Sequence, residues 1–85
     1  MNLIDLEKIL TKENIWKYDY AIGTLNKPLS ETPICLIKDK GGFVYLELER
    51  DKVVYKEVFD SEDKACKFYL TKYSRFEPRL KKYVN

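Results

Sequence analysis

The spacing between apolar residues changes twice along this 85-residue chain, and each change indicates a change of secondary structure. Leu3, Leu6 and Leu10 recur at intervals of three and four residues, which is typical of one face of a helix. From Trp16 to Ile22 every second residue is large and apolar or aromatic, which is typical of a strand. The helical spacing returns near the end of the chain. The sequence therefore predicts helices at both ends and strands between them.

Both predicted helices are preceded by residues that favour a helix start. Asn2 is the predicted N-cap of a first helix over residues 3–12. Asp60 or Ser61 is the predicted N-cap of the second helix, which ends before Pro78 because the residue preceding a proline is pushed out of helical geometry. The apolar face of this second helix consists of Ala65, Cys66, Tyr69, Leu70 and Tyr73.

Turn residues divide the middle of the chain into four predicted strands. Asp39 to Gly42 predicts a turn whose glycines accept positive φ, and Arg50 to Lys52 predicts a second tight reversal. A polar, proline-containing loop is expected over residues 24–32. Because the strands are close in sequence, antiparallel hairpins are the simplest pairing. The predicted strands are residues 16–22, 34–38, 43–49 and 53–59.

The register of the last hairpin stays open between two alternatives. A two-residue loop places the third strand beside Val53 and Tyr55, whereas a three-residue loop places it beside Val54 and Val58. Asp51 is not part of the Asn-Gly pair that a type I′ turn prefers. The turn sequence therefore favours the longer loop.

Together these elements predict the α+β class, with a small antiparallel sheet of three to four strands flanked by an N-terminal and a C-terminal helix. We expect helices to pack on one face of the sheet and the other face to be partly exposed. Residues 1–85 are predicted to form a single domain, because a chain of this length buries only about 60% of its unfolded surface. Residues 78–85 form a short basic C-terminal tail.

The start of the chain, MNLIDLEKIL, carries acids and lacks the basic segment and apolar core of a secretory signal. The longest wholly apolar run, residues 34–37, is far shorter than the about 18 residues of a membrane span. We therefore expect a cytoplasmic protein with no membrane partner. An exposed strand edge leaves a homo-oligomer open, but nothing in the sequence indicates one.

The chain contains no histidine, so the commonest general base and activator of nucleophiles is absent. Cys35 and Cys66 are 31 positions apart and form neither a CxxC pair nor a zinc pattern. Cys66 follows a cluster of acids, which raise rather than lower a thiol pKa, and it lies on the apolar face of a predicted helix. We therefore expect Cys66 to be core filler, and the protein to be no enzyme and to need no metal or cofactor.

Charge is distributed unevenly along the chain. Residues 46–63 contain seven acids and three basic residues, whereas residues 72–85 contain five basic residues and one acid. Such asymmetry affects the choice of partner and the rate of encounter more than the fold. The sequence thus predicts two charged surfaces, one acidic and one basic.

The stretch ICLIKDKGGFVYLELERDKVVYKEVFDSEDKACKFYL, residues 34–70, resembles small bacterial immunity proteins that accompany polymorphic toxins, including those of contact-dependent growth inhibition. The resembling features are an initial helix, a tyrosine-rich hairpin and a joint between strand and helix. The resemblance implies a non-enzymatic inhibitor that binds one cognate toxin domain, often a nuclease. Such an inhibitor covers the toxin's active site or blocks its contact with a substrate or partner protein.

The acidic hairpin is the predicted contact surface for such a toxin. Its acids would steer a basic nuclease, and its aromatic residues would supply desolvated anchors. The plainer alternative is that the acids form a solvated sheet face. We expect simultaneous replacement of Glu47, Glu49 and Glu57 by lysine to leave the fold intact and to weaken toxin binding. The predicted toxin-binding residues are Tyr45, Glu47, Glu49, Asp51, Tyr55 and Glu57, and the second candidate surface consists of Arg75, Arg79, Lys81 and Lys82.

A binding module for double-stranded RNA is the alternative function. Its order of helices and strands is similar, and the basic C-terminal residues together with Phe76 and Tyr83 could contact phosphates or bases. Those domains, however, place lysines where this chain has Asp60, Glu62 and Asp63, and they use a histidine. Nucleic acid is therefore not the expected partner.

Overall fold

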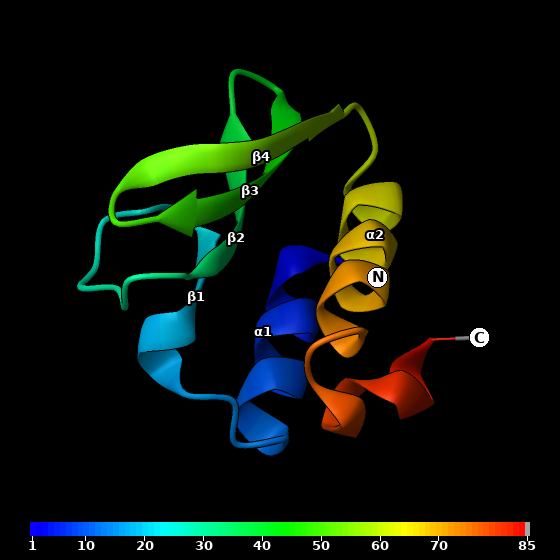
Figure 1. Cartoon of the computed structure of the whole chain (residues 1–85). Coiled ribbons are helices and arrows are strands. Elements are labelled where there is room, and N and C mark those ends of the chain that lie inside the picture. Colours follow the sequence, from blue (N-terminus) through cyan, green and yellow to red (C-terminus); the bar gives the residue numbers. More distant parts are fainter. Residues whose placement is uncertain (85) are drawn as a thin grey trace.

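The computed structural model describes residues 1–84 and shows a four-stranded mixed sheet with helices packed on one side (Figure 1). This arrangement confirms the α+β class and the two flanking helices. The longer elements are α1 (Leu3–Lys12), β1 (Tyr20–Gly23), β2 (Ile34–Asp39), β3 (Gly42–Glu49), β4 (Lys52–Phe59) and α2 (Glu62–Ser74). Two short 3-10 helices are η1 (Lys17–Asp19) and η2 (Pro78–Tyr83). No helix in residues 1–84 is long and apolar enough to cross a membrane.

The helix starts are those that the sequence predicts. The Asn2 side chain accepts a hydrogen bond from the Asp5 amide at 2.8 Å, and the Asp5 carboxylate accepts one from the Asn2 amide at 3.3 Å. Ser61 caps α2, accepting from the Lys64 amide at 3.2 Å. These bonds satisfy amides that have no partner inside a helix. Pro78 does lie beyond the end of α2, at the first position of η2.

The first predicted strand is shorter than the sequence indicates. The aromatic alternation from Trp16 to Ile22 begins in η1, and only its second half forms β1. Trp16 and Tyr18 pack edge to face with their ring centroids 5.0 Å apart instead of spreading across a sheet. The expectation of antiparallel pairing throughout is also wrong here, since β1 runs parallel to β2 while the other neighbours are antiparallel.

The parallel pairing requires the segment 24–33 to carry the chain back to the start of β2. Backbone bonds fix this segment, since the Ser30 amide donates to the Tyr18 carbonyl at 2.7 Å. The Lys27 ammonium donates to the Tyr20 carbonyl at 2.9 Å. Leu29 packs against the small apolar cluster on the sheet face that the helices leave open. That cluster consists of Ala21, Cys35, Val44 and Leu46, all buried. The segment therefore covers part of the face that was expected to be exposed.

The β3–β4 turn has two residues, so the longer loop that the sequence favours is wrong at this point. Arg50 and Asp51 both have positive φ, 49° and 69°, as a type I′ turn requires. Next to the turn, Leu48 pairs with Val53.

A β-bulge at Val54 changes the register beyond the turn. Glu47 pairs with Tyr55, so Val54 has no partner across the ladder. From there on the strands follow the pairing of the longer loop, with Val44 opposite Val58. The hairpin therefore contains both of the registers that the sequence left open.

Candidate functional site

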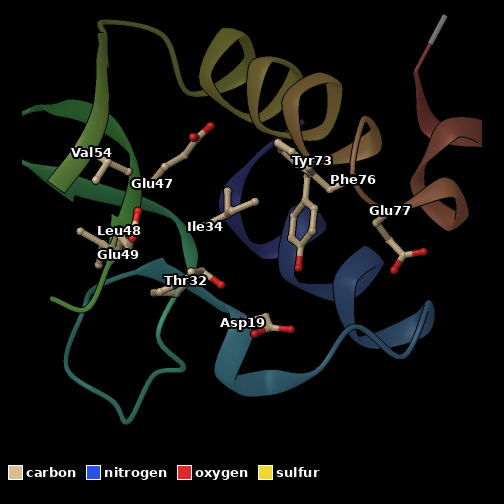
Figure 2. Close-up of a pocket in the computed structure, with 11 residues that line it drawn as sticks. Asp19, Thr32, Ile34, Glu47, Leu48, Glu49, Val54, Tyr73, Phe76 and Glu77 are labelled. Carbon is tan, nitrogen blue, oxygen red and sulfur yellow. The ribbon is translucent and has the colours of Figure 1, made fainter. Parts of the chain in front are cut away.

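A groove of about 480 Å³ lies between the β3–β4 hairpin, the end of α2 and η1 (Figure 2). Its wall contains carboxylates from three separate parts of the chain, and apolar side chains lie between them. The carboxylates belong to Asp19, Glu47, Glu49 and Glu77.

Two of these carboxylates already have cationic partners. The Glu77 oxygens accept from the Arg79 guanidinium at 2.8 and 2.9 Å, and these bonds lower the pKa of Glu77 to about 2. Glu47 lies 3.8 Å from the Lys72 ammonium. Asp19 and Glu49 form no ion pair with any residue in the described range 1–84. The groove therefore retains an excess of negative charge.

Tyr73 brings a buried side chain to the same groove. Its residue surface is only 7% exposed, yet it lines the groove, and Figure 2 shows its hydroxyl directed toward Asp19. Within residues 1–84 no group forms a hydrogen bond with this hydroxyl. Burial raises the pKa of Tyr73 above its usual value, and the negative charges of Asp19 and Glu77 raise it further. The hydroxyl is therefore protonated and free to bond with a ligand.

Apolar side chains complete the groove. Val54, which the bulge leaves without a ladder partner, is 57% exposed, and Phe76, just beyond α2, is 66% exposed. Exposed apolar groups inside a concave, negatively charged surface suit a cation that has an apolar stem.

No protein-family model, curated protein or solved structure matches this chain.

Tyr45 is not on the exposed surface where the sequence analysis placed it. Its side chain is fully buried beneath α2, in edge-to-face contact with Phe68 at 5.0 Å and Tyr69 at 5.9 Å between ring centroids. Its face of β3 is the one that packs against the helices. Tyr45 is thus corrected from a predicted contact residue to a core residue.

Glu47 connects the core to the groove. It accepts a hydrogen bond from the Tyr45 hydroxyl at 2.5 Å, and its side chain is only 23% exposed. A lysine here would place a cation beside Lys72 and leave a buried hydroxyl without its acceptor. The expectation that Glu47 accepts lysine without loss of the fold is therefore corrected.

The other predicted hairpin residues lie apart from one another. Glu49 lines the groove, whereas Asp51 is exposed in the turn. Tyr55 is half-buried under the Lys72 ammonium, 4.5 Å from its ring centroid, and its hydroxyl donates to Glu57 at 3.0 Å. The groove therefore brings together Glu47 and Glu49 from the predicted set, but not Asp51, Tyr55 or Glu57.

The basic C-terminal segment is partly neutralised by contacts within the protein. The Arg79 guanidinium donates to the Glu13 carbonyl at 2.7 Å, and the Lys82 ammonium lies 3.0 Å from the Glu13 carboxylate. A hydrogen bond from Tyr83 and the contact with Lys82 lower the pKa of Glu13. Arg75 and Lys81 are exposed. The predicted basic surface is thus only partly available to a partner.

Only Glu47 and Glu49 among the groove residues were predicted as toxin contacts, and four of the residues that were missed carry its polar and aromatic groups. Tyr73 was assigned to the helix core face, Asp19 to a strand, and Phe76 only to an RNA surface. Glu77 appeared only as the single acid of the basic stretch 72–85. No local pattern indicates that they meet, because their proximity depends on how η1 and the end of α2 pack against the sheet.

Both cysteines are buried and unsuited to nucleophilic chemistry. Cys35 and Cys66 are 0% exposed, and burial raises the pKa of each thiol to about 11. Cys66 packs in the core between α2 and the sheet, where the sequence places it. Within residues 1–84 no three acidic or cysteine side chains are close enough to hold a metal ion.

We predict that a thiol reagent at pH 7 labels neither cysteine in the folded protein. With a pKa of about 11, only about one thiol in ten thousand is ionised at this pH, and burial blocks access. Mass spectrometry of the native and the urea-unfolded protein measures the labelling. Both thiols should react after unfolding, and rapid native labelling of Cys66 would contradict its assignment to the core.

Proposed function

We propose that this chain is a cytoplasmic immunity protein that binds a cognate bacterial toxin domain, a nuclease, and neutralises it by occluding its active site or a partner contact. The observation that carries the proposal is the groove, whose wall combines the unpaired carboxylates of Asp19 and Glu49 with exposed Phe76 and Val54. The resemblance of residues 34–70 to immunity proteins supplies the class of partner.

The groove has the two properties that a specific protein contact needs. Unpaired acids attract a basic surface and accelerate the encounter, and nucleases are basic where they bind phosphate. Covering the exposed side chains of Phe76 and Val54 with a partner removes apolar surface from water, which makes the free energy of binding more favourable. A merely solvated acidic face would not need apolar side chains exposed within a concave surface.

The structure does not favour the RNA-binding alternative. Domains that bind double-stranded RNA use a lysine-rich start of the last helix, but here Glu62 accepts from the Leu3 amide at 2.8 Å and Asp63 pairs with Lys67 at 3.0 Å. The sheet is also mixed rather than wholly antiparallel. We therefore retain only the immunity function.

Co-expression with the protein encoded by the gene immediately upstream tests the proposal, which requires that protein to carry a toxin domain. We expect cells producing both proteins to survive, and the purified proteins to form a 1:1 complex that loses nuclease activity. A catalytically inactive toxin allows the binding to be measured without killing cells. If the cells are not rescued and the purified proteins form no complex, the proposal is refuted. Tight, steeply salt-dependent binding to duplex RNA, measured by fluorescence anisotropy, would favour the alternative.

A further inference from the structure

We infer that the groove receives an arginine side chain of the partner, with the guanidinium bound by Asp19 and the Tyr73 hydroxyl and the stem lying against Phe76. The inference rests on the proposed function only for the identity of the protein that supplies the arginine. The chemistry of the groove can be tested with arginine itself.

The acceptors at this end of the groove match a guanidinium. Asp19 has no cationic partner in the described chain, and the Tyr73 hydroxyl points toward it with no hydrogen bond of its own (Figure 2). A guanidinium carries five donors in a planar fork, so it bonds with a carboxylate and a hydroxyl at the same time. The two groups thus form a pair of acceptors that only a donor from outside the chain satisfies.

The surroundings favour arginine over lysine. A guanidinium is less strongly hydrated than an ammonium, and its flat faces stack on aromatic rings. Phe76 offers an exposed ring at the rim, and Ile34 lines the groove. The rim already contains one such pair, since Arg79 binds both oxygens of Glu77. Lysine, a compact point charge, would use fewer of these contacts.

Glu49 has a secondary role in this arrangement. It lies on β3, in a different part of the groove wall from Asp19 on η1 (Figure 2). Its charge attracts the approaching cation, while Asp19 and Tyr73 hold the guanidinium. Removing Asp19 should therefore weaken binding more than removing Glu49 does.

NMR titration of the 15N-labelled full chain with N-acetylarginine amide tests the inference. We expect saturable shifts in Asp19, Tyr73 and Phe76, with a dissociation constant of about 1 to 10 mM for so small a ligand. N-acetyllysine amide should bind at least about 5-fold more weakly, and uncharged N-acetylcitrulline amide should cause no saturable shift. Equal binding of lysine and arginine, or shifts outside the groove only, would overturn the inference.

Conservative variants measure how much each groove side chain contributes to arginine binding. Asp19→Asn should weaken arginine binding by about 10-fold or more, Tyr73→Phe by about 3-fold, and Glu49→Gln by less than Asp19→Asn. Glu7→Gln is the matched control, because Glu7 is exposed on α1 away from the groove, and it should bind as the wild type does. Dispersed amide shifts show that each variant is folded. Unchanged binding by folded Asp19→Asn would overturn the inference.

The result can be distinguished from that of the rescue experiment. If the upstream toxin is neutralised but arginine does not bind, the immunity function stands and the arginine inference fails. If arginine binds selectively but no toxin is neutralised, the groove chemistry stands and the proposed function fails. If arginine binds selectively and the toxin is also neutralised, replacing individual arginines on the toxin surface by lysine would identify the one that enters the groove.

Discussion

Replacing Tyr45 with alanine is expected to lower the free energy of unfolding by about 3 to 5 kcal/mol. The ring is fully buried beneath α2, and its removal leaves a cavity beside Phe68 and Tyr69. It also leaves Glu47 without the hydroxyl that donates to it at 2.5 Å. A chain of 85 residues has a total stability of about 4 to 13 kcal/mol, so this loss removes much of the margin. Thermal unfolding should show a melting temperature about 15 to 30 °C lower.

Two further variants show whether the loss arises from core packing. Tyr45→Phe keeps the ring and removes only the hydrogen bond to Glu47, so it should cost about 1 kcal/mol. Val58 lies on the same sheet but is 62% exposed. Val58→Ala should therefore change the free energy of unfolding by less than about 0.5 kcal/mol. If Tyr45→Ala melted like the wild type, Tyr45 would be a surface residue, as the sequence analysis assumed.

The elements that were predicted correctly depend on short-range interactions. The cap at Asn2 is decided by residues within one turn of it, and so is the cap at Ser61. The glycine turn between β2 and β3 depends on φ preferences at single positions, and Gly41 does have a positive φ of 81°. Such features leave a direct pattern in the sequence, and this is why the helices and the last three strands appear where they were expected.

The errors arose where a distant contact decides the outcome. The alternating aromatics at 16–22 have strand propensity, but Trp16, which precedes η1, packs edge to face against Tyr18 within it. In β3, alternation correctly places Tyr45 and Glu47 on one face, yet it does not say which face α2 covers. The sequence interpretation chose the wrong face of β3 as the one that packs against the helices. This one error placed Tyr45 on the surface instead of in the core. The bulge at Val54 likewise leaves no sequence signal beyond two adjacent valines.

The groove was the least predictable feature, because four separate parts of the chain build it, residues 32–34 among them. Asp19 comes from η1, Glu49 from β3 and Tyr73 from α2. Charge counting along the sequence identified the acidic hairpin and thus Glu47 and Glu49. It did not include Asp19, which is isolated in sequence, or Tyr73, whose spacing is that of a core residue. What distinguishes Tyr73 from Tyr20, Tyr45 and Tyr69 of the core is its place in the groove wall, with its hydroxyl directed toward Asp19 (Figure 2).

Reversing the charge of the groove is expected to have the largest effect on toxin binding. The double substitution Asp19→Lys with Glu49→Lys should weaken the complex with the proposed cognate toxin domain by about 100-fold or more. Both side chains lack ion-pair partners in residues 1–84, so their replacement disrupts no internal salt bridge. Calorimetry or surface plasmon resonance with a catalytically inactive toxin measures the affinity, and circular dichroism verifies the fold.

The matched control changes the net charge equally but outside the groove. Glu7 and Asp39 are exposed and do not line it, so Glu7→Lys with Asp39→Lys should change affinity by only a few-fold, through long-range repulsion that salt screens. The groove variant should instead stay weak at high salt, because it loses direct contacts as well as steering, and its dissociation should be faster. If both double variants instead lost the same affinity and regained it when salt was added, general electrostatic attraction would explain the effect of the groove acids on affinity. The interface would then lie elsewhere, first of all at exposed Arg75 and Lys81.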